Sequence, residues 1–148
     1  MTATTWLALA AIFAGGVAIA VQAPINARLA GSVGDPVAAA AISFLVGFLV
    51  LAVITIVRGA VPSLAELSAA PWWAWAGGAL GAIYVWAAVW SVGTIGVVTM
   101  VAALILGQLL AALVLDATGA FGLAVRELSL TRLAAVGFVA IGLVLSRV

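Results

Sequence analysis

Only nine of the 148 side chains carry a formal charge, and this scarcity constrains the fold more than any other feature of the sequence. Soluble domains carry about 25% charged residues because a water-facing surface has to be solvated. Here the charged share is 6%, the hydrophobic share is 68% and the mean hydropathy is +1.46. Nine charges cannot cover a soluble protein of this size, although they suffice for the loops of a membrane bundle. The sequence therefore predicts an all-α integral membrane protein.

Apolar segments long enough to span a bilayer divide the chain, since a spanning helix takes about 20 residues for ~30 Å of hydrocarbon. We expect five of them, at about 6–29, 36–57, 72–91, 97–115 and 130–146. Asp35 can cap the second helix, and Pro36 fits a first helical turn. Only a Gly/Thr turn at 93–96 separates the third span from the fourth. We count them as two spans, because one merged helix would be too long for a bilayer. The chain is thus predicted to be a single five-helix transmembrane domain.

Several functional classes are excluded by what the sequence lacks. The chain has neither His nor Cys, which removes the usual ligands of zinc, haem and iron–sulfur centres. The four carboxylates fall near predicted helix ends and make a poor metal site. A net charge of +1 gives no basic face for nucleic acid. We therefore predict a protein that is not an enzyme and that needs neither a metal nor another cofactor.

The arginines give almost no orientation signal. An odd number of spans puts the termini on opposite sides, and the side richer in Arg and Lys usually faces the cytoplasm. Arg58, Arg126 and Arg132 fall on the side of the N-terminus, against Arg28 and Arg147 on the other. Such a chain can be expected to insert both ways up. If Arg28 lies inside the protein, the alternative is a modest preference for an inside N-terminus.

Polar side chains within the spans are the candidate substrate ligands, because such groups are costly in lipid and tend to face protein or water. Gln108 lies in the middle of the fourth span. Gln22 and Asn26 are four residues apart and share a helix face, with Pro24 between them weakening the backbone hydrogen bonding. The alternative for Gln108 is a hydrogen bond that only assembles the bundle. For Gln22 and Asn26, the alternative is a helix that ends early.

Other candidates complete this set. Tyr84 in the third span and Ser43 in the second are added as substrate ligands, and Asp116 is the candidate for proton or cation coupling. Asp116 adjoins a spanning core at a helix C-terminus, where the helix dipole disfavours a carboxylate. The alternative is that Asp116 is only a solvated loop residue. Small residues let membrane helices approach closely, and on this ground the candidate packing positions are Gly77, Gly81 and Gly107.

The order and spacing of several motifs resemble the DUF606 (YdcZ) family of the drug/metabolite transporter superfamily. These motifs are Gln22-Ala-Pro-Ile-Asn26-Ala-Arg-Leu29, Gly34-Asp35-Pro36, Ser43-Phe-Leu-Val-Gly47, the segment from Pro71 to Tyr84, Gly107-Gln108, Asp116, Gly119 and Gly122. The resemblance implies one half of a ten-helix transporter built from inverted repeats, in a bacterial cytoplasmic membrane. It also implies that some members insert with dual topology and pair antiparallel, whereas others form oppositely oriented pairs.

The leading functional hypothesis is therefore a transporter of a small organic solute that acts by alternating access. Inverted-repeat transporters place the substrate near the midplane, between the repeats. One five-helix chain supplies one repeat, so an antiparallel homodimer or an oppositely oriented homologue would supply the other. A dual-topology ion channel is the first alternative, and a non-transporting membrane assembly subunit is the second. The spans contain no mid-membrane carboxylate, which favours a neutral or zwitterionic solute.

Overall fold

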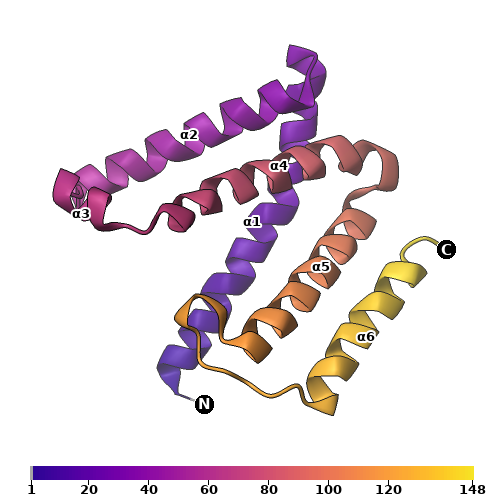
Figure 1. The fold of residues 1–148 in the computed structure, drawn as a ribbon. Coiled ribbons are helices and arrows are strands. Elements are labelled where there is room, and N and C mark those ends of the chain that lie inside the picture. The colour runs from indigo at the N-terminus through magenta and orange to yellow at the C-terminus, as the bar shows by residue number, and fades with distance from the viewer. Residues whose placement is uncertain (1) are drawn as a thin grey trace. The chain divides into compact units, whose positions relative to one another are not determined.

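The computed structural model describes residues 2–148, and the regular structure in this part of the chain is helical (Figure 1). The elements in chain order are α1 (Ala3–Val33), α2 (Pro36–Val57), α3 (Leu64–Ala69), the 3₁₀ helix η1 (Trp72–Trp75), α4 (Ala76–Ile95), α5 (Val97–Thr118), the 3₁₀ helix η2 (Ala120–Gly122) and α6 (Leu130–Leu145).

The prediction of a helical membrane protein is confirmed. Four helical segments are long and apolar enough to cross a bilayer, namely Ala3–Val33, Pro36–Val57, Trp72–Ile95 and Val97–Thr118. The predicted fifth span corresponds to α6, which is a shorter apolar helix of 16 residues. The structure thus supports four spans by length, with α6 as a further apolar helix.

The first helix is longer than the predicted 6–29. It continues through Pro24 and the neighbouring polar residues to Val33, and Gly34 ends it with a φ of 84°. The alternative interpretation, in which the helix ends early at Gln22 and Asn26, is therefore wrong. A proline removes one donor and clashes with one carbonyl, which can kink a helix without ending it, and membrane helices tolerate this change. Both amides consequently lie on one continuous helix.

Other boundaries also differ from the expected ones. The turn expected at 93–96 reduces to Gly96, whose φ of 77° separates α4 from α5. The fourth span extends beyond residue 115 to Thr118, so that Asp116 is helical. The loop between the second and third spans contains α3. Ser63 and Glu66 cap the N-terminus of this helix with a reciprocal capping box. As predicted, Asp35 caps α2, its Oδ1 accepting from the Ala38 N–H at 2.7 Å.

The chain forms two compact units, Met1–Thr94 and Ile95–Val148. The first contains α1 to α4, and its buried cluster joins all three long helices. Ala40 of α2 packs with Val85 and Val89 of α4, and Ala30 of α1 and Tyr84 lie against them. The close backbone contact in this unit is between α1 and α2, and α4 joins them through these side chains.

The second unit is a helical hairpin, in which α5 and α6 lie side by side (Figure 1). Polar contacts join both ends of this hairpin. At one end Thr99 Oγ1 donates to the Ser146 carbonyl at 3.2 Å, and Ser146 Oγ donates to Thr99 Oγ1 at 3.1 Å. At the other end Arg132 pairs with Asp116. The hairpin is therefore held by polar groups at its ends and by apolar packing between them.

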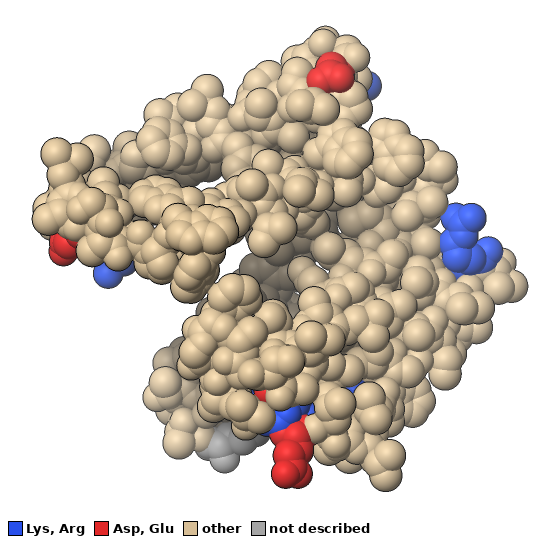
Figure 2. Space-filling model, in the orientation of Figure 1, with Lys and Arg blue, Asp and Glu red and all other residues tan. Residues whose placement is uncertain are grey.

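Large apolar side chains cover much of the surface. Leu7, Phe13 and Phe48 are more than 60% exposed, and no large side chain among the described residues is fully buried. Figure 2 shows a few small charged patches on a face that is otherwise uncharged. Such a surface would be unstable in water but suits contact with lipid or with other membrane helices.

Candidate substrate site

A polar cluster lies between α1 and α2 in the first unit. Gln22 Nε2 donates to Ser43 Oγ at 3.3 Å, and Asn26 Nδ2 donates to the same oxygen at 3.1 Å. Asn26 is only 5% exposed, whereas Gln22 and Ser43 are half-buried. Because residues four apart share a helix face, α1 can direct both amides to one hydroxyl. We call these three residues the amide–serine cluster.

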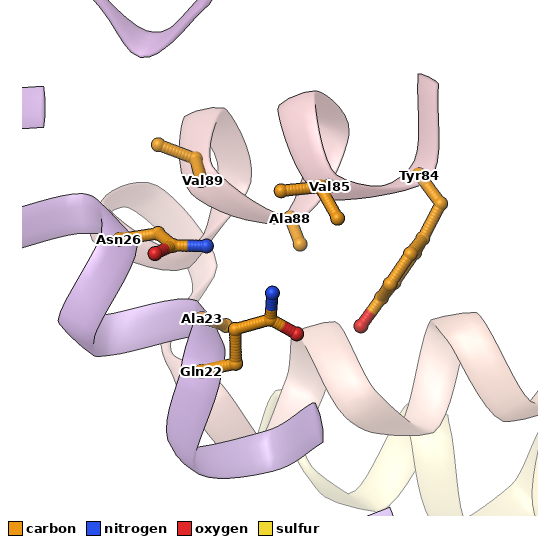
Figure 3. Close-up of a pocket in the computed structure, with 7 residues that line it drawn as sticks. All are labelled: Gln22, Ala23, Asn26, Tyr84, Val85, Ala88 and Val89. Atoms are coloured by element: carbon orange, nitrogen blue, oxygen red, sulfur yellow. The ribbon is translucent and has the colours of Figure 1, made fainter. Parts of the chain in front are cut away.

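Tyr84 lies beside this cluster. Figure 3 shows the amides of Gln22 and Asn26, from α1, and the ring of Tyr84, from α4, directed into the space between the two helices. Val85, Ala88 and Val89 of α4 close this space, which retains almost no free volume. The α1–α4 side of the site is therefore a packed junction, and a ligand would need room elsewhere.

Two larger cavities provide such room, and both include Gln22 and Ser43. The first measures about 510 Å³ and is lined by Ala18, Val21, Gln22, Ile25, Asn26, Leu29, Ile42, Ser43 and Val46. The second measures about 330 Å³ and is lined by Gln22, Ser43, Phe44, Gly47, Phe48 and Leu51. Both volumes fall in the ~300–1,000 Å³ range of small-molecule sites. Apart from the amide–serine cluster, all of the lining residues are apolar.

The structure thus brings four predicted site residues, Gln22, Asn26, Ser43 and Tyr84, together in one unit. The other two polar candidates belong to the second unit. Gln108 lies in the middle of α5 with its side chain exposed. Asp116 lies near the end of α5, and its carboxylate pairs with the Arg132 guanidinium.

The candidate packing glycines have different surroundings. A Cβ at Gly81 would lie 3.3 Å from Cζ of Phe44, so the Phe44 ring of α2 packs directly against α4 at this point. A Cβ at Gly77 or at Gly107 would meet no atom within 4 Å. Their small size is therefore not required by the packing seen within this chain.

Sequence reasoning missed the bridge between Thr99 and Ser146. Thr99 is 7% exposed, although it stands only three residues into α5. A hydroxyl at the start of one predicted span and another at the end of the next would meet in an antiparallel hairpin. That pattern could have indicated the contact.

Comparison with known proteins identifies the family. The model of the family described as "Putative inner membrane exporter, YdcZ" matches residues 6–145. The chain belongs to this exporter family. It is also 28% identical over 123 residues to the inner membrane protein YdcZ of Escherichia coli (strain K12), an alignment that covers 82% of this chain and 83% of that protein. No solved structure matches the chain. As a YdcZ-family protein with several apolar helices, the chain is a multi-pass inner-membrane protein.

Proposed function

We propose that this chain is one half of a transporter that exports a small organic solute by alternating access, with the substrate held at the amide–serine cluster. One observation carries the proposal: two amides converge on the Ser43 hydroxyl beside two open cavities, within helices long enough to span the bilayer. Membership of an exporter family supports the direction of transport.

The proposed topology has five spans, with α6 as the last. Its 16 residues rise about 24 Å, several ångströms short of the ~30 Å hydrocarbon core. Local thinning of the bilayer accommodates such a mismatch at a modest cost. With five spans the two termini lie on opposite sides of the membrane.

The functional assembly we propose is an antiparallel homodimer. One five-helix chain supplies one repeat, and a copy inserted in the opposite sense would supply the other about a two-fold axis in the membrane plane. The weak arginine bias of the loops supports insertion in both senses. Gln108 is exposed in the isolated chain, so a partner copy or the shared cavity would satisfy its amide. An oppositely oriented homologue could take the place of the second copy.

Single cysteines at Thr4 and at Val148 test this assembly, since the native chain has no Cys. Each is labelled with a membrane-impermeant maleimide, first in right-side-out vesicles and then in inverted ones. We expect every site to react in both preparations. Reaction of each site from one side only would exclude the antiparallel homodimer and require an oppositely oriented partner.

Efflux from proteoliposomes loaded with a panel of small metabolites tests transport itself. We expect Gln22→Ala and Asn26→Ala to lower efflux, whereas Thr55→Ala leaves it unchanged because the Thr55 hydroxyl only bonds the Leu51 carbonyl of its own helix. Rates far above those of a carrier cycle would favour an ion channel. Loss of dimerisation on Gln108→Ala, with no solute transported by the native chain, would favour an assembly subunit.

A further inference from the structure

The Ser43 hydroxyl uses its acceptor capacity but not its proton. It accepts from both Gln22 and Asn26, and a hydroxyl has two lone pairs and one donor. Thr55 on the same helix donates to the carbonyl four residues before it, and Ser32 does so on α1. Across residues 2–148, no acceptor is found for the Ser43 proton or for the Tyr84 hydroxyl.

This unused capacity is open to a ligand. Among the described residues, no side-chain nitrogen or oxygen is both fully buried and without a hydrogen-bond partner. The amide oxygens of Gln22 and Asn26, which accept no hydrogen bond among the described residues, therefore adjoin accessible space, and Ser43 lines both of the cavities described above. In lipid an unpaired polar group costs several kcal/mol, so a bound polar group would stabilise this arrangement.

The two cavities around the cluster are apolar and carry no charged side chain. One extends along α1 from Ala18 to Leu29, about 16 Å at 1.5 Å per residue. The other extends along α2 from Ser43 to Leu51, about 12 Å. An ion here would be desolvated without a counter-charge, which is strongly unfavourable.

We propose that the amide–serine cluster binds an uncharged amphipathic solute, whose hydroxyl or amide head accepts from Ser43 and whose aliphatic part fills the apolar cavity beside it. The head donates in return to the amide oxygen of Gln22 or Asn26. This inference rests on the proposed function and names the class of substrate that the same site takes.

Photolabelling tests the proposal directly on the full chain in nanodiscs. The probe is 3-azioctanol, an eight-carbon alcohol whose diazirine inserts into neighbouring side chains on irradiation, at a fixed probe-to-lipid ratio. Mass spectrometry is expected to place adducts on the segments 18–29 and 42–51. Unlabelled octan-1-ol and octanamide are expected to compete, whereas octanoate and octylammonium of the same chain length compete at least tenfold less.

Three variants separate hydrogen bonding from folding. Ser43→Ala is expected to lower labelling about three- to tenfold, since one hydrogen bond to a ligand is lost. Ser43→Thr keeps a hydroxyl and restores labelling, and Thr55→Ala removes a hydroxyl from the same helix without effect. Adducts spread evenly over the lipid-facing helices, or equal competition by the charged compounds, would overturn the proposal. So would unchanged labelling of Ser43→Ala.

The two proposals fail in different ways. Labelling at the cluster without efflux of any solute would leave the binding site in place and overturn the transport function. Efflux of a charged solute that octan-1-ol does not inhibit would leave transport in place and overturn the uncharged substrate class.

Discussion

Asp116 near the end of α5 forms an ion pair with Arg132 in the first turn of α6. A backbone hydrogen bond adds to this contact between the end of α5 and the start of α6, since the Arg126 N–H donates to the Asp116 carbonyl at 2.8 Å. The side chains of Asp116 and Arg132 are 26% and 32% exposed. This contact links the two helices of the second unit at the end opposite the Thr99–Ser146 bridge.

The ion pair is expected to stabilise the hairpin modestly. A double-mutant cycle with Asp116→Asn and Arg132→Gln should give a coupling energy of about 0.5–1 kcal/mol, typical of a partly exposed pair. The measurement is unfolding by SDS titration in mixed micelles. Additive effects of the two substitutions would show that the pair contributes nothing to stability.

Asp116 is also the residue we propose for proton coupling. Among the described residues it is the one carboxylate within the four helices long enough to span. Its protonation would release Arg132, and a proton gradient could thereby drive a rearrangement of the α5–α6 corner. Asp116→Asn should abolish the dependence of efflux on a pH gradient, whereas Asp116→Glu should retain it. Efflux of the Asn variant that still follows the gradient would exclude this role.

The sequence allowed the helical membrane fold and the α2 boundaries to be predicted, because apolar length and the Asp35-Pro36 start are local signals. The convergence of Gln22 and Asn26 on Ser43 could not be predicted in the same way. Helical spacing puts the two amides on one face, but the partner depends on which residues of α2 meet that face. The extension of α1 past Pro24 could not be predicted either, because a proline is compatible with a kink as well as with the end of a helix.

Gly81 is predicted to be the glycine whose size matters most between α2 and α4. A Cβ there would approach the Phe44 ring to 3.3 Å, so Gly81→Leu must displace that ring and should cost about 1–3 kcal/mol. Gly77→Leu is the matched control, because nothing lies within 4 Å of its Cβ position. SDS unfolding should show a loss for the first variant only, and Phe44→Ala should partly restore it. Equal losses for both variants would contradict this packing.

Glu66 should make the start of α3 sensitive to acid. The Ser63 backbone N–H and hydroxyl both hydrogen-bond its carboxylate, which lowers the pKa of Glu66 below its usual 4.5. A lowered pKa stabilises the folded helix at pH values above the usual pKa of the carboxyl group. This stabilisation is lost as the pH falls through the folded-state pKa. Hydrogen exchange of the α3 amides should therefore accelerate, relative to the intrinsic rate, on acidification. Glu66→Gln should remove this dependence, and an unchanged profile would refute it.

Gly119 and Gly122 provide the last test, because both have a positive φ but only one is crowded. Gly119 has a φ of 62°, and a Cβ there would lie 2.7 Å from Cγ2 of Val125 and 3.0 Å from the Leu123 carbonyl oxygen. Gly122 has a φ of 80°, and no atom lies within 4 Å of its Cβ position.

Alanine at Gly122 should therefore cost only the left-handed backbone strain, about 1–2 kcal/mol. Alanine at Gly119 must in addition displace backbone at the corner that places Asp116 beside Arg132, so the loss should be larger by about 1–3 kcal/mol. SDS unfolding measures the two losses, and Gly119→Ala should also weaken the Asp116–Arg132 coupling in the double-mutant cycle. Equal losses would mean that the corner relaxes freely and that backbone conformation alone requires Gly119.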